Sequence, residues 1–369
     1  MKIAFFGPKN FIDYYDIGGF QSYIRRIALK LADYGNKVDY IIYDSKEIKE
    51  KKIANNLMLK YYRTFRDAIN VISLDSYDNI VRIQLPRYDR LKYFFFCEKQ
   101  SCHNRYHCIY FTIPESLIKY KLMLMEVKIA SRYGNIICVS YRQYRILKKD
   151  IKNVFLVFPP VSEDYFLIPS EKPNNKKIKI TFLGMLHPDK GIKEIITLFK
   201  ILKNNSKFEC SVYGIYNPQN KESFRMHNWL KEQNYFKYIE VDKEKYSPKI
   251  EEMVKKVLKK TDIFIQPYIK LENTVDTPLL LLEAMASLCS IITTPLGSIL
   301  EVYGKSDFII NKEDFISRAV SFLRNLSYKK IKEERQRIFE QNKKIDFIAN
   351  KVALKFLEAL VGEKNESRF

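Results

Sequence analysis

The chain has few cysteines, histidines and tryptophans: six, four and one among 369 residues. Six cysteines in a chain of this length are too few for the disulfide framework of a small secreted domain. Residues 1–7 are a short apolar run that ends in Gly7, which is typical of a buried first strand and not of a signal peptide. The sequence therefore predicts a globular, cytoplasmic protein.

Long apolar runs are also lacking. The stretch that comes nearest to the length of a membrane span is 278–297, and Glu283 and Pro295 interrupt it. Burying that carboxylate in lipid would cost about 2.5 kcal/mol or more. We therefore expect a soluble protein, which could still touch a membrane surface as a peripheral protein.

Acidic residues fall short of basic ones, with 43 Asp and Glu against 64 Lys and Arg, a formal net charge of +21. Such a surplus indicates a polyanionic neighbour: nucleic acid, an anionic membrane or a phosphorylated substrate. It also fits base composition alone, because the chain is crowded with Lys, Ile, Tyr, Phe and Asn, which an AT-rich genome over-supplies. Charge by itself assigns no function.

Length and pattern predict two α/β domains. At roughly 150 residues per domain, 369 residues correspond to two domains. In the first half a strand, a glycine turn, an amphipathic helix and a second strand follow each other as a βαβ unit. The pattern restarts after a segment rich in proline and asparagine. We place an N-terminal Rossmann-like domain at 1–160, a linker at 161–177, a C-terminal Rossmann-like domain at 178–345 and a last amphipathic segment at 346–369.

Further buried strands are expected in both halves, because short apolar and β-branched runs recur between helical stretches. They lie at 37–43, 79–83, 108–112 and 135–139 in the first half, and at 178–183, 209–213, 238–241, 262–266 and 290–293 in the second.

Two strand-to-helix turns could bind an anion, since free N–H groups and the helix dipole converge at a helix N-terminus. The first contains Gly18 and Gly19, which match neither a dinucleotide fingerprint nor a P-loop. The second runs from Gly184 to Gly191 and carries Lys190, a point charge suited to a phosphate. The alternatives are an ordinary tight turn and a solvated surface lysine.

Glu283 stands inside an apolar helix that follows Asp276, Thr277 and Leu279. An unpartnered carboxylate would be costly there. The hydroxyls of a bound ribose would satisfy it, and so would backbone N–H groups in a purely structural role.

These turns together resemble the retaining glycosyltransferases of group 1, the family-4-like enzymes related to glycogen, sucrose and lipid-linked sugar transferases. The resemblance covers nearly the whole chain. It rests on Gly18-Gly19-Phe20, Gly35-Asn36-Lys37-Val38, Ile137-Cys138-Val139-Ser140, Phe182-Leu183-Gly184, Lys190-Gly191, Leu282-Glu283-Ala284-Met285-Ala286, and Gly297 with Glu301. It implies the GT-B architecture, in which two Rossmann-like domains face a cleft and the final helix returns to the first domain.

The resemblance also implies roles. The Gly19 N–H lies near the donor diphosphate, Lys190 pairs with it and Glu283 binds the nucleotide ribose. Backbone around Thr277 and Leu279 serves the sugar and phosphates. The donor is a nucleoside-diphosphate sugar, transfer retains the anomeric configuration, and an unidentified hydroxyl on a glycan, a lipid-linked or a protein-linked acceptor receives the sugar. No metal or cofactor is expected, and the chain has no Asp-x-Asp pair.

Three positions depart from the family pattern. Met185 replaces an Arg whose hydrogen bond to phosphate is worth roughly 1.5–3 kcal/mol, unless Lys193 compensates. The family's first acidic residue falls on Val275, so that Asp276 or Glu272 must substitute. The stretch 110–115 lacks the His that the first domain often supplies, and Glu115 is the nearest polar candidate. These departures favour, as the alternative, a degenerate protein that binds nucleotide-sugar without turnover.

Two further features remain open. Cys97, Cys102, His103, His107 and Cys108 cluster in sequence, but their spacing matches no common zinc site. Ordinary loop thiols are the simplest interpretation, with a metal site or a disulfide as the alternatives. The segment 116–133 is apolar with Lys119, Lys121, Lys128 and Arg132, and it could dock an anionic membrane or pack on the core. No nucleic-acid module is recognisable, so we expect no nucleic-acid partner, although the charge keeps basic nucleic-acid binding as a rival.

Overall fold

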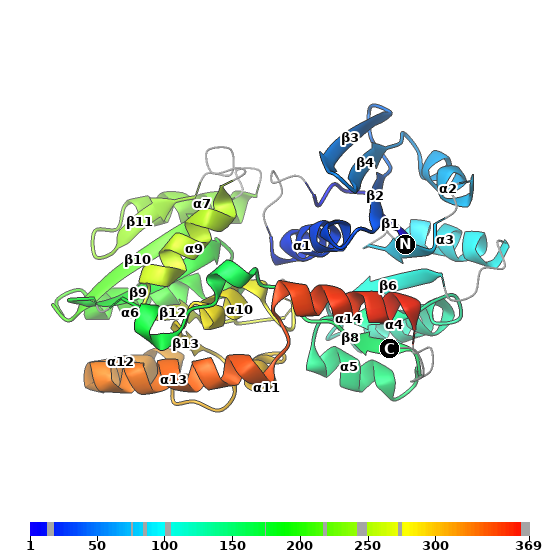
Figure 1. Cartoon of the computed structure of the whole chain (residues 1–369). Coiled ribbons are helices and arrows are strands. Elements are labelled where there is room, and N and C mark those ends of the chain that lie inside the picture. Colours follow the sequence, from blue (N-terminus) through cyan, green and yellow to red (C-terminus); the bar gives the residue numbers. More distant parts are fainter. Residues whose placement is uncertain are drawn as a thin grey trace. The chain divides into compact units, whose positions relative to one another are not determined.

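The computed structural model describes residues 1–12, 18–74, 77–83, 87–99, 105–173, 175–216, 220–241, 249–271 and 275–362. The chain divides into two compact units. The first comprises Met1–Pro160 and Phe347–Phe369, and the second Val161–Asp346. Each unit has its own parallel sheet covered by helices, as Figure 1 shows.

The sheet of the first unit has eight strands in the order β3-β4-β2-β1-β5-β6-β7-β8. All neighbouring pairs are parallel except β3 with β4. The strands span β1 Lys2–Gly7, β2 Lys37–Ile42, β3 Lys49–Ala54, β4 Leu57–Tyr61, β5 Asn79–Arg82, β6 Tyr106–Tyr110, β7 Ile136–Cys138 and β8 Val154–Leu156.

The sequence patterns did not predict β3, β4 or β8. The β3–β4 hairpin lies at the edge of the sheet, where four consecutive residues of β3, Lys49 to Lys52, are exposed. Charged residues on an edge strand discourage pairing with other chains, and they also remove the apolar alternation by which a strand is recognised.

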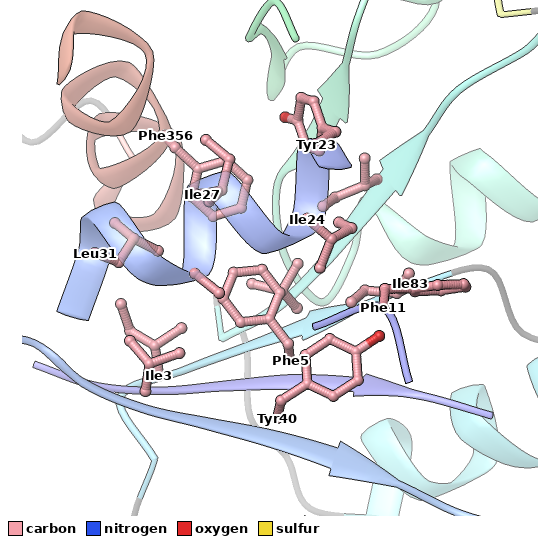
Figure 2. Packing of buried hydrophobic residues seen from close by; sticks show 14 of the residues in the cluster. Ile3, Phe5, Phe11, Tyr23, Ile24, Ile27, Leu31, Tyr40, Ile83 and Phe356 are labelled. Carbon is pink, nitrogen blue, oxygen red and sulfur yellow. The ribbon is translucent and has the colours of Figure 1, made fainter. Parts of the chain in front are cut away.

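The core of the first unit lies on both faces of β1, whose residues from Ile3 to Phe6 are inaccessible to solvent. On one face α1 (Gly19–Asp33) buries Ile24, Ile27 and Leu31. Their spacing of three and four residues places them on one side of the helix. Figure 2 shows these side chains meeting those of β1 and the neighbouring strands.

The last helix, α14 (Ala349–Val361), belongs to this core. It packs beside α1, and the ring of Phe356 stacks on that of Phe5 at 5.9 Å between centroids. The Asn135 side-chain amide donates a 2.7 Å hydrogen bond to the Ala359 carbonyl. The other helices of this unit are α2 Phe65–Leu74, α3 Arg87–Lys99, α4 Leu117–Ala130 and α5 Tyr141–Lys148.

The second unit has a five-stranded, wholly parallel sheet in the order β11-β10-β9-β12-β13. Its strands span β9 Ile178–Met185, β10 Phe208–Ile215, β11 Lys237–Glu240, β12 Ile263–Gln266 and β13 Ser290–Thr293. The helices are α6 Ile192–Leu202, α7 Lys221–Lys231, α9 Ile250–Lys260, α10 Leu279–Ala286, α11 Ile299–Tyr303, α12 Phe315–Asn325 and α13 Tyr328–Lys344, with short 3-10 turns η1 Glu163–Tyr165, η2 Pro169–Glu171 and η3 Pro188–Lys190.

The segment 161–177 is part of the second unit and packs against its helices. The Tyr165 hydroxyl donates to the Glu251 carbonyl at 3.0 Å. The buried Lys172 ammonium donates to the carbonyls of Leu258 and Ser287, at 2.8 and 2.6 Å. These carbonyls end α9 and α10, where a cation is favourable against the helix dipole. Burial lowers the pKa of Lys172. The two carbonyl acceptors hold its side chain at the ends of both helices.

None of the helices in the described ranges combines the length and the hydropathy that crossing a membrane requires.

The packing of α14 predicts how much the first unit depends on the returning helix. Truncating the fully buried Phe356 to Ala leaves a cavity against Phe5, and such changes cost about 3–5 kcal/mol. Urea unfolding of the full chain should show that loss in the transition of the first unit. Leu354→Ala is the matched control on the same helix; its side chain is 50% exposed, so a change within about 0.5 kcal/mol is expected. Equal losses in both variants would contradict the packing role of Phe356.

Candidate functional site

Strand order singles out one place on each sheet. In the second unit the chain runs from β9 outward to β10 and β11, and then crosses to β12 and β13 on the other side. The order therefore reverses between β9 and β12. In open α/β sheets a ligand binds outside the carboxyl ends of the strands at such a switch point. The corresponding place in the first unit lies between β1 and β5.

Gly184 lies at the switch point of the second unit. A Cβ atom built on it would lie 3.4 Å from Nε2 of Gln266, at the end of β12, and 4.0 Å from Cδ2 of Leu280, in the first turn of α10. The ends of two strands and the start of a helix thus converge on this glycine. Sequence reasoning did not select Gln266, although a polar residue that ends the buried run 263–266 was a signal for it.

The turn that carries Lys190 is tied to the loop after β12. A Cβ atom on Gly191, whose φ is +68°, would approach the Pro267 carbonyl oxygen to 2.2 Å. The Ile269 N–H donates to the Asp189 carbonyl at 2.9 Å. These contacts hold Lys190 directly before α6, with its ammonium 5.0 Å from the centre of the Tyr268 ring.

Burial lowers the pKa of Lys190 to about 8, although the nearby Asp189 carboxylate raises it. The desolvated ammonium therefore loses its charge more easily than an exposed lysine, whose pKa is about 10.4. A bound anion would restore the stabilisation of the charge, which makes Lys190 well suited to a diphosphate.

The loop before α10 lies at the same edge of the sheet, and Asp276, Thr277 and Glu283 are all buried, at 1%, 1% and 5% exposure. The turn after β13 holds it: the Ser298 N–H donates to the Asp276 carbonyl at 3.1 Å. Within the described residues the Thr277 hydroxyl oxygen is buried without a hydrogen-bond partner. A buried polar atom in that state is costly, and a polar ligand would satisfy it.

The N-terminus of α10 is itself electropositive. Leu279 is its first residue, the first turn holds no acidic side chain, and no side chain caps the helix. The first N–H groups of a helix have no partner within the helix. Gly184, Lys190, Asp276, Thr277, Leu279 and Glu283 are thus brought to one edge of the second unit, facing the end of the sheet where two helices begin.

Gly18 and Gly19 lie at the equivalent edge of the first unit. Gly18 precedes α1 in extended conformation, no side chain caps the helix, and its first turn has no acidic residue. At the switch point of this sheet, a Cβ on Gly7 would lie 3.1 Å from the Ile83 carbonyl oxygen. The two predicted anion turns therefore occupy the same topological position in the two sheets.

The positions that depart from the family pattern in the second domain lie close to the same turns. Met185 is the last residue of β9 and is 43% exposed. Lys193, which could replace the absent Arg, is exposed in the first turn of α6. Val275 is partly buried beside Asp276, and Glu272 lies outside the described residues.

His107 has a structural role. Its Nε2 is 2.9 Å from the Asn79 side-chain oxygen, and its Nδ1 accepts the Asn135 N–H at 3.0 Å. Burial lowers its pKa to about 3, so the ring is neutral and both nitrogens are engaged. Cys97 and Cys108 are buried in the core, while Cys102 and His103 lie outside the described residues. Over the described parts of the chain, no three His, Cys, Asp or Glu side chains are grouped closely enough to hold a metal ion.

Comparison with known proteins agrees with this geometry. Residues 166–345 match the family described as glycosyl transferases group 1. No curated protein sequence matches the chain. Solved structures that match over the whole length include HepE of Anabaena in complex with UDP and glucose (TM-score 0.70, 12% identity, 98% of this chain and 100% of that one). Others are an α,α-trehalose-phosphate synthase (UDP-forming) of Burkholderia xenovorans (0.71, 9%, 98% and 100%) and a glycosyltransferase of Rickettsia africae (0.66, 14%, 98% and 99%).

At these identities the solved structures establish the fold of both units, and the family match covers nearly all of the second. The expected GT-B architecture is confirmed, and residues 166–345 are similar to the group 1 glycosyl transferases.

Proposed function

We propose that this protein transfers a sugar from a nucleoside-diphosphate sugar to a hydroxyl acceptor, with retention of the anomeric configuration. The observation that carries the proposal is the placing of Lys190 and the N-terminus of α10 at the switch point between β9 and β12. A desolvated cation and the first N–H groups of a helix, at one sheet edge, favour the binding of a diphosphate.

Each residue takes one part in this scheme. Lys190 pairs with the diphosphate and stabilises the charge that develops on it as the sugar–phosphate bond breaks. The backbone around Thr277 and Leu279 donates to phosphate and sugar oxygens, and the Thr277 hydroxyl gains a partner. Glu283, one helical turn after Leu279, accepts the ribose hydroxyls. Gly19 of the first unit contributes its N–H to the diphosphate, and Asp276 is the acidic residue nearest to the transferred sugar.

We propose that catalysis needs no metal ion, because Lys190 and two helix N-termini supply the positive potential that a metal would otherwise provide. HepE of Anabaena was solved with UDP and glucose, which makes a uridine nucleotide the first donor to test on this chain.

The second candidate function is binding without turnover, which Met185 favours. Its thioether ends β9 at the switch point, where an Arg would give a charge-assisted hydrogen bond to the donor. Lys193 is the cation placed to compensate. Measuring binding and turnover separately distinguishes the two functions.

We also propose that the protein works in the cytoplasm at an anionic membrane that carries the acceptor. On α4, Leu117, Ile118 and Met125 are 65%, 73% and 57% exposed, and Lys119, Lys121 and Lys128 lie on the same helix. Exposed apolar and basic side chains on one helix favour an anionic lipid surface. Sedimentation with vesicles containing anionic lipid should therefore exceed that with neutral vesicles and fall for Ile118→Glu; no lipid dependence would contradict the proposal.

The donor site is tested with the UDP, GDP and ADP forms of common sugars, using thermal shift for binding and nucleoside diphosphate release for turnover. One donor should stabilise the protein and be hydrolysed or transferred in the presence of EDTA. Lys190→Ala and Glu283→Ala should each lower the affinity for that donor by tenfold or more, since each removes a charged partner worth about 1.5–3 kcal/mol. Lys200→Ala, an exposed lysine of the same α6, is the matched control and should behave as wild type.

Stabilisation without nucleotide release would favour binding without turnover. No response to any donor, combined with salt-sensitive binding to nucleic acid, would overturn the transferase proposal.

The pH dependence of donor binding follows from Lys190. Its pKa in the free protein is about 8 because the ammonium is desolvated. Below that pH the charge attracts the diphosphate; above it a proton must first be taken up, so donor affinity should fall by up to tenfold per pH unit. Titration calorimetry from pH 6.5 to 9.5 measures this fall. Lys190→Arg keeps its charge throughout and should bind with a flat profile, whereas an unchanged slope would assign the titration to another group.

A further inference from the structure

The first unit contains an open pocket of about 570 Å³ between α3 and α4, beyond the ends of β5 and β6. Arg82, the last residue of β5, and Tyr110, the last of β6, lie at its inner end. The pocket therefore lies at the carboxyl edge of the sheet, where ligands of α/β proteins bind.

The walls of this pocket are apolar. Leu91 and Phe94 come from α3, and Leu122 and Met125 come from α4. Leu91 and Met125 are 56% and 57% exposed although both are large apolar side chains. Large exposed apolar side chains gathered around a hollow mark a place where an apolar partner is buried.

The inner end is cationic. The Glu126 carboxylate accepts from Arg82 at 2.7 Å and from Arg90 at 2.6 Å, and the Tyr110 hydroxyl donates to it at 3.0 Å. One carboxylate thus serves two guanidinium groups. Lys119 adds a third cation to the lining, so the charged residues around the pocket sum to +2.

Arg82 is only 4% exposed, and its Nη1 has no hydrogen-bond partner among the described residues. The adjacent Cys108 thiol does not balance the charge, because burial raises its pKa and keeps it neutral. The aromatic rings of Phe94, Tyr110 and Tyr93 surround the guanidinium at 5.2 to 5.9 Å. A buried cation without full compensation favours an anion in the space beside it.

The pocket adjoins the glycine turn of the first unit. Phe111, one of its lining residues, contacts Phe20 edge-to-face with 4.0 Å between ring centroids. Phe20 directly follows Gly19, the residue assigned to the donor diphosphate. A molecule in the pocket would therefore lie close to the glycine turn of the first unit.

We propose that this pocket is the acceptor site and that the acceptor is an anionic amphiphile, whose acid group is held by the cations of the inner end while its apolar chain lies between α3 and α4. The proposal deepens the proposed function and rests on it. It accounts at once for the apolar walls, the excess of two positive charges and the contact with Phe20.

The probe is decyl phosphate, kept below its critical micelle concentration and titrated into the full chain by calorimetry. It should bind at least tenfold more tightly than decanol and than inorganic phosphate, because each control lacks one half of the recognised chemistry. Inorganic phosphate that binds as tightly as decyl phosphate would reduce the site to an anion site. Equal binding of decanol would reduce it to an apolar crevice, and either result overturns the proposal.

Two pairs of variants in the first unit locate the binding. Met125→Glu and Lys119→Gln change lining residues of α4 and should each lower the affinity for decyl phosphate by about tenfold. Leu354→Glu on α14 and Lys149→Gln directly after α5 are the matched controls, exposed in the same unit and outside the lining, and they should bind as wild type. Losses that are equal in the lining variants and the controls would show that the binding is not in the pocket and overturn the proposal.

Failure of this proposal can be told apart from failure of the donor site. Lys190→Ala should lose the donor and still bind decyl phosphate, while Met125→Glu should bind the donor and lose the amphiphile. Donor binding without any binding of decyl phosphate would overturn the acceptor site and leave the transferase standing. Binding of decyl phosphate by a chain that takes no donor would overturn the acceptor role.

Discussion

The second unit depends on the close approach of Gly191 to the backbone of Pro267. A Cβ atom at this glycine would lie 2.2 Å from a carbonyl oxygen, a distance that no side chain tolerates, and its φ of +68° favours glycine on its own. The approach fixes the start of α6 against the loop after β12. Lys190 directly precedes this glycine, and burial lowers its pKa to about 8. Gly297 plays the same part for the loop before α10, since its Cβ would lie 2.9 Å from the Asp276 carbonyl oxygen.

A second constraint keeps the sheet edge in place from the opposite end. Asp262, which directly precedes β12, is fully buried and forms an ion pair with Arg335 of α13. The same carboxylate accepts the Lys179 N–H of β9 at 2.8 Å. The two strands that flank the switch point are therefore joined at their amino ends by a buried charge. An ion pair in this position is costly to break because either partner alone would be left buried and uncompensated.

Sequence patterns predicted the strands that are buried on both faces and the turns that follow them, because apolar runs and glycines mark them directly. The resemblance selected Gly184, Lys190 and Glu283, but only the strand order of the folded chain brings them to one sheet edge. The exposed edge strand β3 carries no apolar alternation, and it was missed for that reason. Strand β4 was missed although Leu57 and Leu59 alternate toward the core. Arg82 and Glu126 were missed because nothing local links them: they are 44 residues apart and meet only once β5 and α4 pack together. Gln266 was missed for the same reason, because its side chain comes close to Gly184 only once β12 pairs with β9.

Composition gives the net charge of +21 but not where in the fold that charge lies. Much of it lies on exposed lysines, where an AT-rich genome is a sufficient explanation. Among the buried or partly buried cations are Lys190 in the turn before α6, and Arg82 with Arg90 at the inner end of the pocket. Desolvation makes a buried cation more dependent on a nearby anion than a surface lysine is. The diphosphate and the acid group that we propose as ligands would each lie beside one of these two groups of cations.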